Sequence, residues 1–204
     1  MSYKSTHTGT KIDKTVSQFT DNGFLLHEDS GRAYLDVDFP IIIRTTGSGR
    51  PALNVLAGNI TAPQWAVTNF LVCEGQELIH GWDEGSPVSW HLHMITGGTD
   101  VDDRYVNFQV EYTYATLGSQ LAAVDTRSSG NVLIPANTPD RTHTIVPIHT
   151  FTPSEAKIGT QVYARLDRIA TTDGAAAPTA DPFVSMLQIH ILVNTMGSRN
   201  IGTK

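Results

Sequence analysis

Alternation of apolar and polar residues along the chain predicts β-strands far more often than helices. The clearest case is the segment 105–114, which keeps a strict period of two over ten residues. One face of this segment would carry Val106, Phe108, Val110, Tyr112 and Tyr114. Such a period is typical of a half-buried strand in an antiparallel sheet. The segment 33–43 alternates in the same way before the turn-rich residues 46–51.

Further strands are predicted along most of the remaining chain, with Gly, Pro, Asn or Asp in most of the gaps between them. They cover residues 64–73, 77–82, 87–95, 104–116, 143–151, 160–170 and 183–194. Helical signals are weak: the capping box at 152–155 allows barely one turn, and 115–125 could form either a short helix or a strand. Residues 127–131 and 172–182 are expected to be loops. The pattern predicts an all-β, antiparallel two-sheet sandwich.

The first 30 residues differ from the rest of the chain. They are rich in Thr, Ser and Lys, and their apolar residues Ile12, Val16, Phe19 and Phe24 are widely spaced. Such a segment cannot bury enough apolar surface to fold alone, so it is either mobile or ordered by a partner. We expect an extended N-terminal arm at 1–30 that carries a docking surface, and one sandwich domain at 31–204.

Composition narrows the class of protein. Only 17% of the residues are charged, and 17 Gly and 10 Pro residues suit a turn-rich β protein. The net charge of −6, without any basic run, argues against nucleic-acid binding. The N-terminus lacks an apolar signal core, and no stretch approaches the roughly 20 apolar residues of a membrane span. Cys73 is the single cysteine, which suits folding in a reducing cytoplasm and predicts a small buried residue.

Histidines occupy positions where a plain core strand would carry valine or threonine. His91 and His93 would lie on one face of their strand, opposite Trp90, Leu92 and Met94. Period two places His190 on one face with Val184, Met186, Gln188 and Leu192, and Phe183 on the other with Leu187 and Ile189. Because both faces are apolar, we expect one to face the core and the other to face a neighbouring subunit.

The histidines have two alternative interpretations. His91, His93 and His190 could hold zinc or iron, as histidines do in cupins, but no Glu follows His93 at the cupin spacing. The interpretation we favour is structural: the imidazoles hydrogen-bond to one another, to Thr or Gln, or to a neighbouring subunit, without metal or cofactor. If His190 is buried and neutral, its pKa is lowered and acid loosens the oligomer, whereas bonding to an acid such as Glu111 would reverse the sign.

Other candidate sites carry weaker signals. The acidic run at 100–103 lacks the ligand and Gly positions of a calcium loop and predicts a solvated turn. Glu74, Glu77, Asp83 and Glu84 could include a glycosidase carboxylate pair, although nothing fixes their separation. The tryptophans at 65, 82 and 90 could stack on sugars, but core packing is their more frequent role. No catalytic residue is assigned, and we expect no enzymatic activity.

Three segments resemble the structural proteins of tailed-bacteriophage virions. They are the His-x-His segment 89–94, the Glu-Tyr segment 111–115, and the late segment 189–198, which runs from Ile-His to Thr-x-Gly-Ser. Ile191 and Asn194 replace a Tyr and an Asp of the phage pattern, which weakens a shared ligand role and leaves a structural one.

The resemblance implies a jelly-roll-like sandwich in the virion, made in the host cytoplasm. It also implies a homo-oligomer, most simply a trimer, that contacts other capsid, neck or tail proteins and no nucleic acid or membrane. A receptor- or glycan-binding tip module is the alternative, followed by a cupin-like metal-binding protein.

Overall fold

The computed structural model describes residues 17–19, 25–27, 33–42, 47–153 and 156–194, and it is all-β. In chain order, its strands are β1 (Ser17–Phe19), β2 (Leu25–His27), β3 (Ala33–Phe39), β4 (Ala52–Ala57), β5 (Ile60–Gln64), β6 (Phe70–Val72), β7 (Gln76–Glu77), β8 (Val88–Ile95), β9 (Arg104–Ala115), β10 (Asp125–Ser128), β11 (Val132–Ile134), β12 (His143–Phe151), β13 (Gln161–Ile169) and β14 (Phe183–Val193). Within these ranges, no helix is long and apolar enough to cross a membrane.

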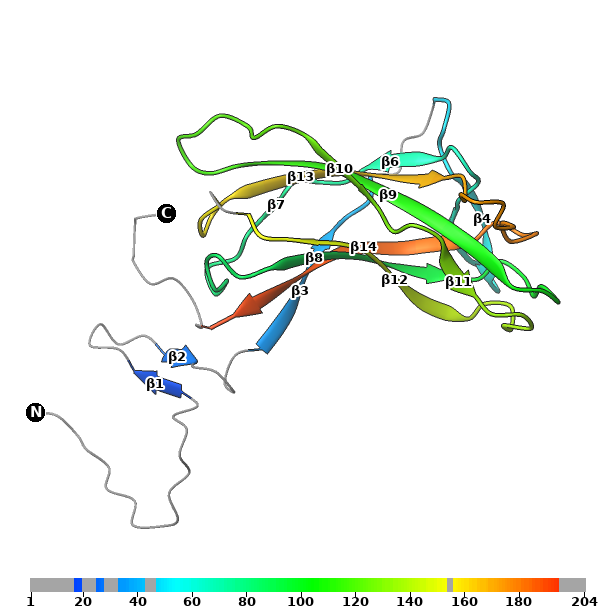
Figure 1. Ribbon diagram of the computed structural model, residues 1–204, viewed down its shortest axis with the longest axis horizontal. Coiled ribbons are helices and arrows are strands. Elements are labelled where there is room, and N and C mark those ends of the chain that lie inside the picture. The colour runs from blue at the N-terminus through cyan, green and yellow to red at the C-terminus, as the bar shows by residue number, and fades with distance from the viewer. Residues whose placement is uncertain (1–16, 20–24, 28–32, 43–46, 154–155, 195–204) are drawn as a thin grey trace, which may run out of the picture.

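Two antiparallel layers pack face to face (Figure 1). The first layer has the order β12-β8-β14-β3, and the β4–β5 hairpin extends it where Phe183 pairs with Gln64. The second layer has the order β10-β9-β13-β6, with β11 paired to β9 and β7 to β13. From β5 to β14 the chain changes layer at each step except from β6 to β7 and from β9 through β10 to β11, whereas β3, β4 and β5 all lie in the first layer. The predicted two-sheet sandwich is therefore confirmed, and its strand order is jelly-roll-like.

The long strands were predicted closely, because each has one face in the core. In β9, Val106, Phe108, Val110 and Tyr112 are buried, as the period of two requires. The predictions for β8, β12, β13 and β14 match their observed bounds to within one residue.

The short strands were predicted less well. The predicted strand 64–73 is interrupted by a turn at 65–69, where Thr68 has a φ of 75°. Of the predicted strand 77–82, only Glu77 belongs to a strand. The segment 116–124 is a loop, neither of the two predicted alternatives of helix and strand, and part of the predicted loop 127–131 belongs to β10. The hairpin β4–β5 was missed, although Gly58-Asn59 between two apolar runs is a hairpin signal.

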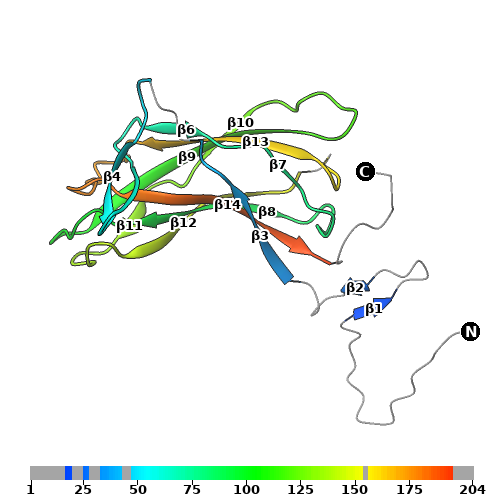
Figure 2. The same cartoon turned by 180° about the vertical axis from the view of Figure 1, so that it is seen from behind.

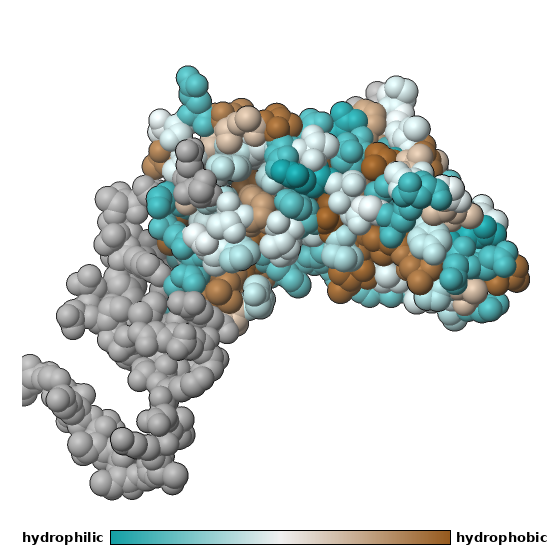
Figure 3. Space-filling view, viewed as in Figure 1, coloured by the Kyte–Doolittle hydropathy of each residue, from teal (hydrophilic) through white to brown (hydrophobic). Residues whose placement is uncertain are grey.

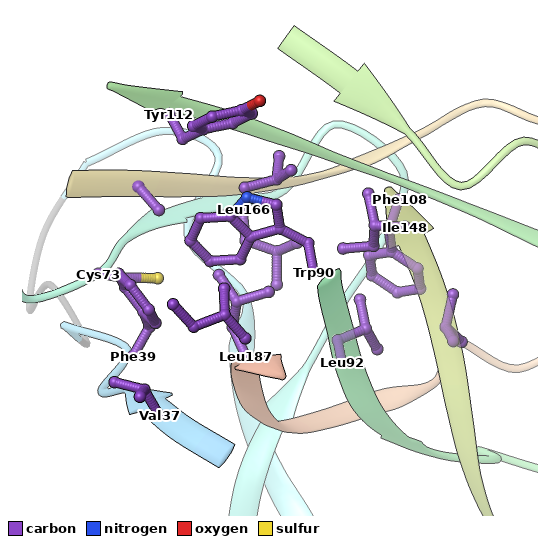
Figure 4. Close-up of a cluster of buried hydrophobic side chains, with 14 of the residues drawn as sticks. Val37, Phe39, Cys73, Trp90, Leu92, Phe108, Tyr112, Ile148, Leu166 and Leu187 are labelled. Atoms are coloured by element: carbon purple, nitrogen blue, oxygen red, sulfur yellow. The ribbon is translucent and has the colours of Figure 1, made fainter. Parts of the chain in front are cut away.

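The core lies between the layers and contains large aromatic side chains (Figure 4). Trp65, Trp82 and Trp90 are all fully buried, so the surface required for stacking on sugars is not present on these rings. Cys73 is also buried, and burial raises the pKa of its thiol to about 12. The prediction of a small buried residue at this position is therefore confirmed.

A β-bulge in β14 changes which residues share a face. Its register with β8 shifts between Val184 and Met186. Val184 is consequently part of the core cluster, whereas the Phe183 ring lies under the guanidinium of Arg141, 4.5 Å from its carbon. The predicted assignment of Val184 to the His190 face and of Phe183 to the opposite face was therefore wrong. The extra residue of a bulge exchanges the two faces for the residues that precede it.

Part of the predicted arm contains paired strands. β1 and β2 form a two-stranded antiparallel ladder that belongs to neither layer, and β1 includes Phe19. Ile12, Val16 and Phe24 lie outside the described residues, as does the Thr-x-Gly-Ser ending. The docking role of the arm remains a prediction.

Candidate functional site

Strand register assembles a polar site on the outer surface of the first layer, the surface that faces away from the core. We call this surface the histidine face. Two neighbouring cross-strand rows contribute to it, each running from β12 through β8 and β14 to β3. The rows are Pro147, His91, Gln188 and Asp38, and Thr150, Ser89, His190 and Asp36. The buried side chains Trp90, Leu92 and Met94 alternate with these residues along β8, as predicted.

The first row is tied together by hydrogen bonds. The His91 Nε2 and Gln188 Oε1 atoms lie 3.0 Å apart, and Gln188 Nε2 donates to Asp38 Oδ1 over 2.5 Å. Both His91 and Gln188 are buried, although they lie on an outer face. The predicted hydrogen bonding of a histidine to glutamine is therefore observed, and Gln188 on β14 links His91 on β8 to Asp38 on β3.

The second row contains a close contact between an imidazole and a carboxylate that the sequence did not predict. His190 Nε2 lies 2.5 Å from Asp36 Oδ1, and His91 Nε2 lies 3.8 Å from the same oxygen. The rings of His91 and His190 have centroids 4.2 Å apart. His190 is not buried as expected, because its side chain is 44% exposed, and its acidic partner is Asp36 rather than Glu111.

His93 belongs to a different pair. Its Nδ1 atom lies 2.8 Å from His143 Nε2, and the two rings stack with centroids 4.9 Å apart. Its ring lies 5.4 Å from that of His91. The structure thus brings His91 and His190 together and directs His93 toward His143, a residue that sequence reasoning missed.

A shallow groove of about 590 Å³ adjoins the two rows. Its lining includes the imidazoles of His91 and His190, the hydroxyl groups of Ser89 and Thr150, and the side chain of Pro147. Ser89 and Thr150 share a hydrogen bond of 2.7 Å between their hydroxyl oxygens. One side of the histidine cluster therefore opens onto a surface that a small polar molecule or a neighbouring side chain can reach.

The electrostatics of the cluster act most clearly on His91. Burial lowers the pKa of His91 below its ordinary value of 6.5, and the neighbouring His190 and His93 lower it further. The hydrogen bond between His91 and the accepting amide oxygen of Gln188, and the charge of Asp36, oppose this shift without reversing it. His91 is consequently held neutral, which is the role that the sequence analysis had given to a buried His190.

We expect His91 to make the protein less stable in acid. Since its folded pKa lies below the unfolded value of 6.5, the unfolded chain binds the proton more readily. The stabilisation from neutral His91 is complete above about pH 6.5 and is lost as the pH falls through the lowered folded value. Melting temperatures measured with a chelator present should fall less steeply toward pH 5 for His91→Gln than for the parent. Parallel curves would contradict the expectation.

The other candidate groups make structural contacts. Asp100 accepts hydrogen bonds from Thr179 Oγ1 at 2.7 Å and pairs with Arg104 at 3.2 Å, so it joins two loops. Asp83 accepts a hydrogen bond from Asn194, and Glu84 accepts one from the backbone of Ile158. Asp100, Asp83 and Glu84 therefore have structural partners within the chain. Their positions do not require a calcium site or a glycosidase carboxylate pair.

No known protein family matches the sequence of this chain, and no curated protein sequence matches it.

Proposed function

We propose that the protein is a non-enzymatic structural component of a tailed-phage virion that assembles as a homo-oligomer, with three copies as the simplest assembly. The proposal is supported by the jelly-roll-like topology and by the segments that resemble phage structural proteins. The histidine face is the surface through which the copies contact one another. Head, neck and tail positions in the particle all remain compatible with this role.

The composition of the histidine face carries the proposal. Around the buried pair of His91 and Gln188 lie apolar side chains that are unusually exposed for their size. Tyr34 on β3 is 70% exposed, Ile145 on β12 is 52% exposed and Met186 on β14 is 37% exposed. Aromatic residues and methionine are enriched in protein interfaces, and grouped exposed apolar residues mark contact surfaces.

A second copy of the chain is the occupant that best suits this face. Gln188 is hydrogen-bonded to His91 and Asp38 within the chain, so an incoming surface mainly needs to cover the exposed apolar side chains. On the side of the molecule drawn in Figure 3, apolar residues form separate patches among polar ones rather than one continuous area. In a closed ring, each copy contacts two neighbours.

Light scattering on the purified full chain tests the proposal. We expect a mass near three times the chain mass of 22.2 kDa, and a monodisperse monomer at micromolar concentration would contradict it. Ile145→Glu and Met186→Glu should each shift the protein toward monomer, because they place a charge in the desolvated contact.

Val101→Glu is the matched control for these two variants. Val101 is also an exposed apolar residue, but it lies in the loop between β8 and β9. Its substitution should leave the mass unchanged. Equal dissociation by all three variants would mean that the contact does not involve the histidine face.

A further inference from the structure

We propose that the histidine face binds a divalent transition-metal ion through Asp36, His91 and His190. One ligand atom from each of the three residues lies within 4.8 Å of the other two. The sequence-based expectation of no metal had considered His93 as the third donor, and the structure offers Asp36 in its place. This site does not depend on the proposed role in a virion.

The three donors come from three adjacent strands, which fixes their spacing. Asp36 and His190 are direct cross-strand partners on β3 and β14, and His91 lies diagonally across from His190 on β8. Side chains in these two relations lie within mutual reach on an antiparallel sheet. The site is therefore built on regular strands rather than on loops, and it needs no change in the backbone to form.

The observed distances bring the donor atoms close together. His190 Nε2 lies 2.5 Å from Asp36 Oδ1, and His91 Nε2 lies 3.8 Å from the same oxygen. Zinc binds imidazole nitrogen at about 2.0–2.1 Å and carboxylate oxygen at about 2.0–2.2 Å. An ion among the three atoms would separate Asp36 from His190 and draw His91 inward, which are side-chain movements.

The donor set defines the class of ion. Two imidazoles and one carboxylate suit zinc, iron and neighbouring divalent metals, whereas calcium and magnesium prefer sites made of oxygen ligands. Three protein donors leave at least one coordination position open. His91 and His190 both line the groove beside the cluster, so water or an oxygen ligand can reach that position.

Gln188 lies directly beside the proposed site. Its amide oxygen lies 3.0 Å from His91 Nε2, and its amide nitrogen donates to Asp38. Because one imidazole nitrogen cannot donate a hydrogen bond and bind a metal at the same time, metal binding through Nε2 would replace the bond between His91 and Gln188.

Metal binding would join β3 to the rest of the first layer. β3 pairs only with β14 among the described strands, and it follows the N-terminal 30 residues (Figure 2). A metal held by residues of β3, β8 and β14 would link β3 to β14 and β14 to β8. Because a metal that binds only the folded chain stabilises it, saturating zinc should raise the melting temperature.

Cobalt and zinc titrations of the full chain, after dialysis against chelator, test the site. We expect one equivalent of Co²⁺ per chain with visible absorption bands, and displacement of Co²⁺ by Zn²⁺. Asp36→Asn and His190→Gln should each weaken zinc binding by at least about tenfold, because each removes a donor. The zinc-induced rise in melting temperature should be lost with them.

Two control variants separate this site from other histidines. His80→Gln removes an imidazole between β7 and β8 that pairs with Glu77, and it should leave zinc affinity unchanged. His93→Gln should have little effect if Asp36 is the third donor, and it should abolish binding if the three histidines form the site.

Three results would overturn the proposal: less than about a tenth of an equivalent of bound metal, equal weakening by His80→Gln, or loss of binding only with His93→Gln. Circular dichroism of each variant without metal establishes that it is folded. Light scattering on the metal-free parent reports the oligomer separately, so failure of the metal site leaves the proposed function standing.

Discussion

Arg168→Ala is expected to lower the free energy of unfolding by about 3–5 kcal/mol, the cost of removing one partner from a buried ion pair. The Arg168 side chain is only 2% exposed and lies at the end of β13. Its Nη1 atom donates to the backbone carbonyl of Trp65 and to the Asp181 carboxylate. One cation therefore holds the turn after β5 and the segment before β14 against the second layer.

The expected loss comes mainly from groups left without a partner. The Trp65 carbonyl would remain buried without its donor, and a cavity would replace the long side chain. The Asp181 carboxylate is 42% exposed and can be hydrated, which places the effect toward the lower end of the range.

Urea unfolding of Arg168→Ala and Asp181→Asn measures this contribution. Asp181→Asn retains an acceptor for the guanidinium and creates no cavity. It should therefore lower the free energy of unfolding clearly less than Arg168→Ala does. A loss below about 1 kcal/mol for Arg168→Ala would show that water replaces the guanidinium without penalty.

The single variant Trp90→Ala is expected to lower the free energy of unfolding by about 3–5 kcal/mol. This loss is typical of removing a large aromatic side chain from a core. The Trp90 ring lies between the layers, with the Phe39 ring 4.7 Å away and the Tyr112 ring 5.6 Å away (Figure 4). These neighbours come from β3 in the first layer and β9 in the second. Truncation would therefore remove contacts that hold the two sheets together.

Thermal and urea unfolding of Trp90→Ala should be compared with two variants. Trp90→Phe keeps an aromatic ring in the same place and should recover much of the loss. Val101→Ala removes an exposed side chain and should change stability by no more than about 0.5 kcal/mol. Equal stability of Trp90→Ala and Val101→Ala would contradict the central position of this ring in the core.

The long strands could be predicted from sequence because burial imposes a period of two on them. β9 shows this directly, since its buried apolar side chains Val106, Phe108, Val110 and Tyr112 are spaced two residues apart. The bulge in β14 could not be predicted, because a bulge adds one residue to one strand without any change in composition. The β4–β5 hairpin was missed for another reason: Leu53 and Val55 are exposed, so their alternation is not tied to the core.

The candidate site depends on information that alternation does not contain. Period two was sufficient to place His91 and His93 on one face and His190 on an outer face. The presence of Asp36 beside His190 follows from the pairing of β3 with β14, two strands separated by most of the sequence. Local patterns do not specify which strands pair or in which register, so neither Asp36 nor the partnership of His143 with His93 could be predicted.

The jelly-roll-like sandwich provides a rigid support for the surface that we propose as the contact between copies of the chain. The first layer buries its inner face against the second layer and leaves the histidine face outward, with exposed apolar residues on β3, β12 and β14. Contacts made by strand side chains on such a support are well defined, because the packed core beneath them restricts their movement.

Quantitative mass spectrometry of gradient-purified phage particles, from cells that produce this chain, tests the proposed role most directly. We predict that the chain is present in intact particles in a fixed ratio to the major capsid protein, consistent with complete rings of identical copies. Recovery of the chain only in the free soluble fraction, with particles containing no more of it than of host contaminants, would contradict the role in the virion.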